Sequence, residues 1–189
     1  MQSVIKETII AQLLLLPQLS DKYLAQDPSY VFDVALWLKQ TELKLEPMRS
    51  PLVSTLASLR GLLEASDDGY EDEKINNSSR SKRKGKRALA ASLLTQADTI
   101  LNTELERIDT RFSAANEKLA QLLALVFAKQ PMPIVQNMTT AYLNSIWQTL
   151  GEHPETKSMY LYLQASLSAT DRRYLLQHLL INMIVDPVD

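Results

Sequence analysis

The sequence predicts an all-α protein, an antiparallel helical bundle of about six to eight helices with one long central helix and a charged flexible loop. Apolar residues recur at spacings of three and four through nearly the whole chain, which is the period of one face of an α-helix. Prolines and polar capping residues separate these periodic segments. Glycine occurs only 4 times in 189 residues, where an average composition gives about 13, so turn-rich all-β folds are disfavoured.

The first 65 residues contain several such segments, each bounded by proline. Pro17 ends or kinks the first segment, because proline lacks the amide hydrogen that an α-helix uses. Asp27-Pro28 is typical of a helix start, with a capping residue before proline at the first helical position. Glu46-Pro47 ends that helix, since a residue before proline avoids the helical region. The predicted helices cover 3–16, about 19–26, about 28–45 and about 51–65.

Residues 66–85 break the helical pattern. Within and next to this stretch, 67–73 contains five acids and no base, and 80–87 contains six bases and no acid. A segment with so few apolar groups cannot offset the conformational entropy that it would lose on ordering. We therefore expect a charged flexible loop at 66–85 between an N-terminal helical lobe, 1–65, and a long helix with a C-terminal helical lobe, 86–189. The lobes are expected to form one continuous domain.

A long helical pattern runs from about Lys86 to Lys129. Its second part repeats apolar residues in an unbroken 4-3 alternation, the heptad spacing with which helices pack against each other. This seam is either the central core helix of the protein's own bundle or a surface for self-association or a partner helix. The apolar face is wider than a two-stranded seam needs, which favours the first interpretation. The predicted helix is about 66 Å long, which favours the second. The candidate interaction residues of the seam are Leu101, Leu105, Ile108, Phe112, Leu119 and Leu122.

Three shorter helices are expected in the remaining C-terminal part. Gly151 is expected to end the first of them at the C′ position. Ser168 and Asp171 resemble a capping box with aspartate in place of glutamate, at the start of the last helix. Tyr160 and Tyr162 form part of an aromatic patch that is either core or a binding surface, because tyrosines are common interface anchors. The predicted helices cover about 134–150, 155–166 and 169–184.

The basic run 80–87 is the sharpest local feature of the sequence. Six cations in eight residues can contact phosphates, so one alternative function is a nucleic-acid-associated protein. The preceding acids would repel a phosphate backbone, and the run contains no aromatic side chain to stack on bases. A solvated loop balanced by those acids is therefore favoured. The candidate residues for an exposed electrostatic contact are Arg80, Lys82, Arg83, Lys84, Lys86 and Arg87.

The local signatures of catalysis and of cofactor binding are missing. Cysteine is absent, and neither His153 nor His178 stands in a His-Glu-x-x-His or Glu-x-x-His pattern, so the helical zinc and di-iron signatures fail. None of the glycines forms a phosphate-binding or nucleophile-elbow motif. We expect no metal, no cofactor and no enzymatic activity, with an active site assembled from distant residues as a second alternative.

The function that we expect is a non-catalytic helical interaction module: an adaptor, an assembly or secretion accessory factor, or a structural subunit. It would pack apolar helix faces against a protein partner or a second copy of itself. The net charge of −2 gives no overall attraction for nucleic acid. The lack of cysteine fits a reducing compartment, and no stretch reaches the ~18–20 apolar residues of a membrane span. We therefore expect a cytoplasmic protein.

Overall fold

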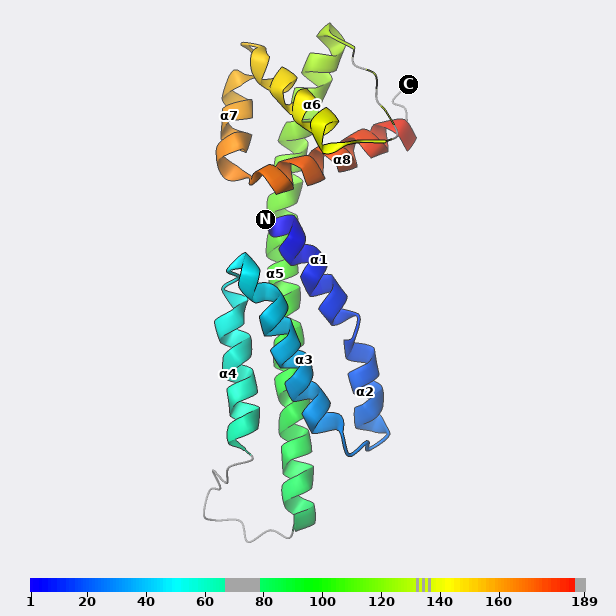
Figure 1. Ribbon diagram of the computed structural model, residues 1–189, viewed down its shortest axis with the longest axis vertical. Helices are drawn as coiled ribbons and strands as arrows, with labels where there is room; N and C mark the ends of the chain where they lie inside the picture. The colour runs from blue at the N-terminus through cyan, green and yellow to red at the C-terminus, as the bar shows by residue number, and fades with distance from the viewer. Residues whose placement is uncertain (67–78, 132, 134, 136, 186–189) are drawn as a thin grey trace. The chain divides into compact units, whose positions relative to one another are not determined.

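The computed structural model describes residues 1–66, 79–131, 133, 135 and 137–185. Within these residues every regular element is helical and no strand occurs, which confirms the all-α prediction and the presence of one long helix (Figure 1). The elements are α1 (Gln2–Leu13), α2 (Leu16–Leu24), α3 (Tyr30–Leu45), the 3₁₀ segment η1 (Glu46–Met48), α4 (Leu52–Ala65), α5 (Ser79–Lys129), α6 (Thr140–Glu152), α7 (Lys157–Ser166) and α8 (Ala169–Val185).

The protein divides into two compact units. The N-terminal unit is Ile5–Glu106, and the C-terminal unit is Met1–Val4 together with Arg107–Asp189. The N-terminal unit thus contains most of α1, all of α2 to α4 and the first part of α5. The C-terminal unit contains the second part of α5 with α6, α7 and α8.

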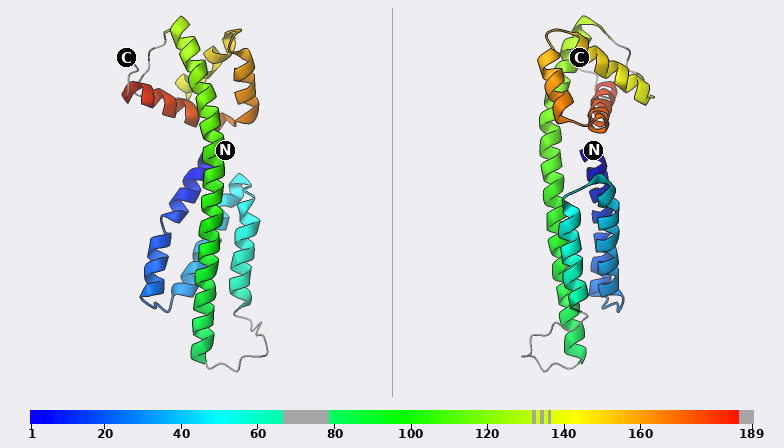
Figure 2. Two further views of the ribbon diagram at one scale, coloured as in Figure 1. Left: turned by 180° about the vertical axis from the view of Figure 1, so that it is seen from behind. Right: turned by 60° about the vertical axis from the view of Figure 1, so that its left-hand side comes forward.

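In the N-terminal unit, α3 and α4 lie side by side and antiparallel along the first part of α5 (Figures 1 and 2). The predicted 4-3-4 spacing of leucines in α4 is confirmed as its buried face. Burial of one leucine side chain contributes about 1.5–3 kcal/mol, so this face holds the helices together. The buried leucines of α4 are Leu52, Leu56, Leu59 and Leu63, and they share the core with Leu38 and Leu45 of α3 and Leu93 and Leu101 of α5.

The break between α1 and α2 lies where proline predicts it. Pro17 occupies the first turn of α2, where its missing amide hydrogen is not needed. The carbonyl of Gln12, near the end of α1, accepts a hydrogen bond from the indole Nε1 of Trp37 at 3.2 Å. The buried hydroxyl of Thr41 also approaches the Gln12 side-chain oxygen, at 3.4 Å. The end of α1 is thus fastened to α3 by buried polar contacts.

In the C-terminal unit, α6, α7 and α8 pack on one another beside the second part of α5 (Figure 2). The expected cap of α8 is confirmed, since the Ser168 hydroxyl accepts from the Asp171 amide at 3.1 Å. Gly151 does not end α6, which continues to Glu152 and has His153 as its C-cap. Instead, a Cβ atom on Gly151 would lie 2.8 Å from the ring of Tyr160. Glycine is needed there because an aromatic ring packs directly on the backbone.

Two predicted helix starts are wrong. The long helix begins at Ser79 and not at Lys86, because lysine and arginine are good helix formers even without apolar neighbours. Of the predicted loop 66–85, residues 67–78 lie outside the described residues. The helix expected from residue 134 begins at Thr140, because Thr139 caps it by accepting from the Tyr142 amide at 3.2 Å.

Candidate partner-binding site

Arg87 fastens the connection between α2 and α3 to the start of α5. Its guanidinium donates to the main-chain carbonyls of Lys22 and Asp27 at 3.1 Å each, and also to that of Tyr23. Each of these carbonyls also accepts from a backbone amide, those of Lys22 and Tyr23 from the amides of Asp27 and Gln26, so Arg87 adds a second, charged donor to the end of α2. The guanidinium carbon also lies 5.2 Å from the ring centroid of Tyr23 and 5.3 Å from that of Tyr30. Arg87 therefore has a structural contact that its place in the basic run does not predict.

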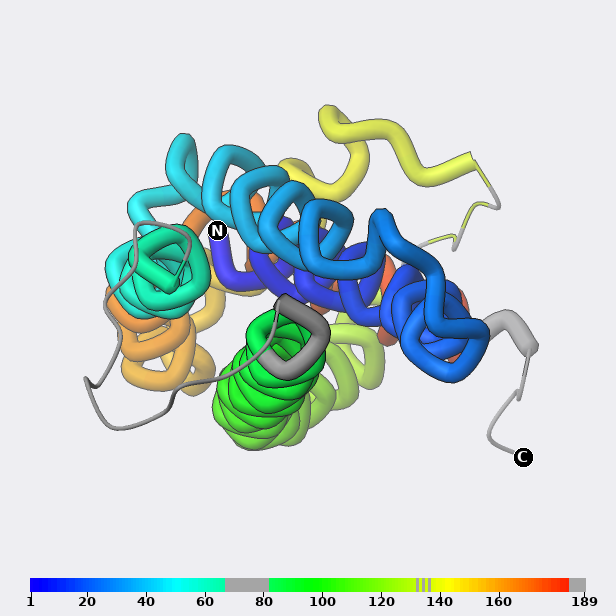
Figure 3. The backbone as a smooth tube through the Cα atoms, turned by 90° about the horizontal axis from the view of Figure 1, so that it is seen from below, coloured from blue at the N-terminus to red at the C-terminus, as the bar shows by residue number. Residues whose placement is uncertain are grey.

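This anchor brings the basic run beside the start of α3 and the end of α4. Two pockets there share Pro28 and Val31 as lining residues. One has a volume of about 270 Å³, and the other has a volume of about 410 Å³. We call the two pockets together the α3–α5 groove; Figure 3 looks onto this end of the unit. Its lining includes Asp27, Pro28, Val31, Phe32, Leu63, Glu64, Arg83, Lys84, Lys86 and Arg87.

The apolar part of the groove is centred on α3. Phe32 leaves 69% of its surface exposed although its helix neighbours Tyr30 and Val34 are buried. Leu36, one turn further along the same face of α3, is also exposed. Phe32 was not among the candidate residues from the sequence. The sequence does indicate Phe32 in one respect. It lies four residues before Leu36, so the two side chains share a face of α3 that differs from the buried face.

The charges of the groove do not cancel. Four basic and two acidic residues line it, which leaves a local charge of +2. One of the acids, Glu64, is ion-paired, because both of its oxygens accept from the Arg60 guanidinium at 2.7 and 2.9 Å, although Arg60 is shared with Glu42. The other, Asp27, accepts from the Ser29 amide at 2.8 Å, and hydrogen bonds from the backbone and the side chain of Ser29 lower its pKa.

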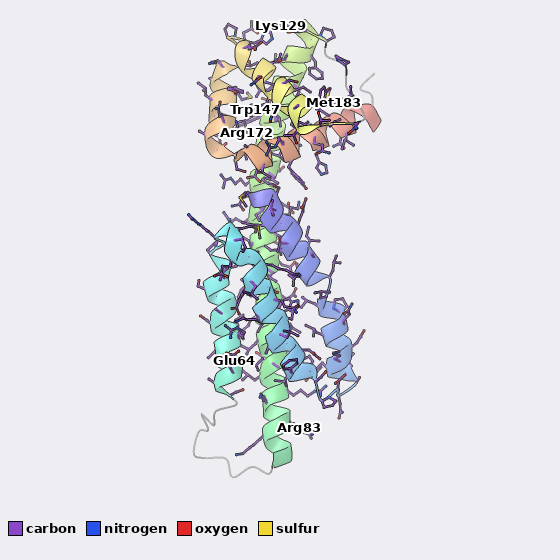
Figure 4. All side chains as sticks on the ribbon, viewed as in Figure 1. Glu64, Arg83, Lys129, Trp147, Arg172 and Met183 are labelled. Atoms are coloured by element: carbon purple, nitrogen blue, oxygen red, sulfur yellow. The ribbon has the colours of Figure 1, made fainter. Side chains whose placement is uncertain are left out.

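Arg83 and Lys84 are the exposed cations of the groove. Neither side chain makes a hydrogen bond or an ion pair with another described residue. Both lie in the second turn of α5, near the positive end of the helix dipole, so the helix adds to their positive potential. Figure 4 labels Arg83 near the start of α5 and Glu64 near the end of α4. The groove thus combines an exposed apolar surface with two cations, Arg83 and Lys84, that have no acceptor among the described residues.

The candidate seam lies inside the protein's own core. Leu101, Ile108, Phe112, Leu119 and Leu122 are all buried, and Leu105 is half-buried. The ring of Phe112 packs against that of Tyr174 of α8, with 5.8 Å between the ring centroids. These side chains are covered by other parts of the same polypeptide, which supports the core interpretation of the seam.

The two tyrosines of α7 have different surroundings. Tyr160 packs on Trp147, with 5.0 Å between the ring centroids. Tyr162 is exposed, next to the exposed Leu161, and the Lys118 ammonium lies 4.4 Å from its ring centroid. Only Tyr162 therefore presents most of its surface to solvent.

Among the described residues, no three acidic or histidine side chains come together in a way that would hold a metal ion. No helix in the same part of the protein has the length and apolar character needed to cross a membrane. Of the remaining predicted cations, Arg80 has no described side chain, whereas Lys82 is exposed and Lys86 lines the groove. Comparison with protein-family models, with curated proteins and with solved structures gave no match.

Proposed function

We propose that this protein is a non-enzymatic interaction module that binds an acidic, apolar segment of a partner protein in the α3–α5 groove. One observation carries the proposal: exposed Phe32 lies in the same groove as Arg83 and Lys84, two cations without an acceptor among the described residues. An occupant has to cover apolar surface and supply negative charge. An amphipathic segment with acids beside its apolar face does both.

The groove offers affinity and specificity through different residues. Burial of Phe32 against a partner would remove apolar surface from water at about 25 cal/mol per Å². Arg83 and Lys84, at the rim, would speed the encounter with an acidic partner and exclude a basic one. Since neither cation makes an ion pair or a hydrogen bond with a described residue, both are available to an acidic partner.

A protein segment suits this groove better than a nucleic acid. Phe32 is a single aromatic ring in this lining, and its apolar neighbours Pro28, Val31 and Leu63 are aliphatic, so successive bases would find no series of rings on which to stack. A phosphate backbone carries a charge at every nucleotide, so some of its charges would lie beside Asp27. A peptide can place its acids only near Arg83 and Lys84 and its apolar side chains against α3, which follows the separation of cations and apolar surface in the groove.

Selection from a displayed library of random peptides tests this function while the partner is unidentified. Peptides that bind the full-length protein are expected to be enriched in Asp and Glu adjacent to Leu, Ile, Phe or Trp. Binding of the selected pool is expected to fall when the bait carries Phe32→Ser, and to persist when the bait carries Leu43→Ser, a change at an exposed leucine of α3 outside the groove. A pool without acid enrichment, or one that both baits bind equally, would contradict the proposal.

A further inference from the structure

A small pocket in the C-terminal unit, lined by residues of α6 and α8, carries a separate inference that does not depend on the α3–α5 groove. Its lining includes Trp147 from α6 and Arg172 and Arg173 from α8, with Leu143 and Leu176 as apolar surface. Its volume is about 40 Å³. A single water needs about 10–15 Å³, so the pocket admits a group of a few heavy atoms.

Two buried hydrogen-bond donors of this pocket have no acceptor. The indole Nε1 of Trp147 and the guanidinium Nε of Arg172 are both inaccessible to solvent, and neither finds a partner among the described residues. Trp147 as a whole is only 9% exposed. The side-chain oxygen of Gln2 in the same unit is likewise buried without a partner, and Asn144 lines the pocket. A buried donor left unsatisfied costs about 1–3 kcal/mol, so an acceptor that enters the pocket and reaches both donors gains that energy.

The two donors belong to side chains that touch. The guanidinium carbon of Arg172 lies 4.9 Å from the ring centroid of Trp147, and Figure 4 labels the two residues beside each other. Arg173 lines the same pocket and adds a second guanidinium. Within the described residues neither Arg172 nor Arg173 makes a side-chain ion pair. The pocket is therefore positively charged as well as rich in donors.

The nearest acid in the sequence, Asp171, is not available as the acceptor. Its Oδ1 accepts from the amide and the hydroxyl of Ser3, at 2.8 Å each. Its Oδ2 accepts from the Ser168 hydroxyl at 2.7 Å and from the amino group of Met1. The hydrogen-bonding capacity of this carboxylate is thus used elsewhere in the unit.

We propose that the pocket binds a carboxylate of a peptide, from either an acidic residue or the peptide's own carboxy terminus. A carboxylate is planar and has two acceptor oxygens, one for the indole N–H of Trp147 and one for the guanidinium N–H of Arg172, whose side chains are in contact. Its negative charge balances Arg172 and Arg173. The carbon next to the carboxylate packs against Leu143 and Leu176. A larger, rounder phosphate does not match a pocket of this volume.

Titration of the ¹⁵N-labelled protein with sodium acetate tests the proposal, because the protein has only 2 tryptophans. The Nε1–H signal of Trp147 is expected to shift downfield and to saturate. The Nε1–H signal of Trp37 is an internal control, since that group already donates to the Gln12 carbonyl at 3.2 Å. Arg172→Gln is expected to weaken acetate binding about tenfold, which is about 1.4 kcal/mol. Lys118→Gln, which removes one charge from the same unit outside the pocket, should leave it unchanged.

Two peptides identify the source of the carboxylate. One has a free carboxy terminus and no acidic side chain, and the other is amidated at that end and has an internal glutamate. Either peptide, if it displaces acetate, supports the proposal. Three results overturn it: a Trp147 signal that acetate does not move, one that chloride moves equally at the same ionic strength, or one that responds fully in folded Arg172→Gln.

Discussion

The guanidinium carbon of Arg87 lies 5.3 Å from the ring centroid of Tyr30, and the same guanidinium donates to the carbonyl of Asp27. This single side chain joins the first turns of α5 to the start of α3. It therefore brings Arg83 and Lys84 to Pro28 and Val31, which lie more than 50 residues earlier in the sequence. The groove depends on this anchor.

Replacement of Arg87 by methionine is expected to lower the free energy of unfolding by about 1–3 kcal/mol, because it removes the charged hydrogen bonds to three carbonyls and the contact with the rings of Tyr23 and Tyr30. Arg87→Lys should recover only part of this, since lysine lacks the planar fork that reaches several carbonyls. Urea denaturation followed by circular dichroism measures the change. Arg83→Met is the matched control and should stay within about 0.5 kcal/mol of the wild type. Equal effects of the two methionine variants would mean that Arg87 is not an anchor.

Two glycines are expected to respond to alanine with opposite signs. At Gly151 the new Cβ would meet the Tyr160 ring at 2.8–3.0 Å, so Gly151→Ala should destabilise the protein by about 1–3 kcal/mol. At Gly61, inside α4, a Cβ has no neighbour within 4 Å, so Gly61→Ala should stabilise it by about 0.5–1 kcal/mol. Thermal unfolding of both variants measures this. A neutral Gly151→Ala would contradict the close packing of the ring on α6.

Asp171 is expected to make the protein sensitive to acid. Burial alone would raise the pKa of Asp171, but hydrogen bonds from the Met1 amino group, the Ser3 amide and the Ser168 hydroxyl outweigh burial and hold it well below its usual value. Because the pKa is lower in the folded state, the carboxylate stabilises the fold fully at pH values above its unfolded pKa of about 3.9. This contribution is lost as the pH falls through the folded pKa.

Asp171→Asn should therefore cost about 1.5–3 kcal/mol at neutral pH, because its hydrogen bonds are made to a charged group. Between about pH 5 and pH 2, the wild type is expected to lose more stability than the variant does. Urea denaturation across this range compares the two. Parallel curves for wild type and variant would show that the Asp171 carboxylate is not the group that titrates.

Phe112→Asp is expected to unfold at least the C-terminal unit, since a charge would replace a buried ring at a cost of several kcal/mol. Leu125→Asp on the same helix should be tolerated, because Leu125 is 46% exposed. Circular dichroism and light scattering together separate the two interpretations of the seam. A folded monomeric Phe112→Asp protein, obtained from an oligomeric wild type, would restore the seam as an interface between copies.

Local sequence pattern predicted much of the fold but little of the candidate sites. The leucines of α4 recur every three or four residues after Pro51, so the apolar period together with a proline at its start defines that helix. The Ser168 cap of α8 is equally local. The start of α5 was missed because a cationic segment without apolar residues resembles a loop in composition although its residues favour helix.

The groove could not be found in this way. Phe32 and Arg83 are brought together only by tertiary packing, and no spacing in the sequence expresses that relationship. The same holds for Trp147 and Arg172: each belongs to an ordinary amphipathic helix, and their unsatisfied donors appear only when both helices are in place.

Peptide affinity measured on two double variants of equal charge tests the central claim most directly. A labelled peptide from the selected pool is titrated by fluorescence anisotropy with wild type, Arg83→Glu/Lys84→Glu and Lys39→Glu/Lys44→Glu; the last pair lies on α3 outside the groove. The groove variant should bind at least tenfold more weakly, a loss of about 1.4 kcal/mol, and the control variant should bind about as tightly as the wild type. Equal loss in both variants, no loss in the groove variant, or displacement of the peptide by a single-stranded oligonucleotide would contradict binding of an acidic partner segment in the α3–α5 groove.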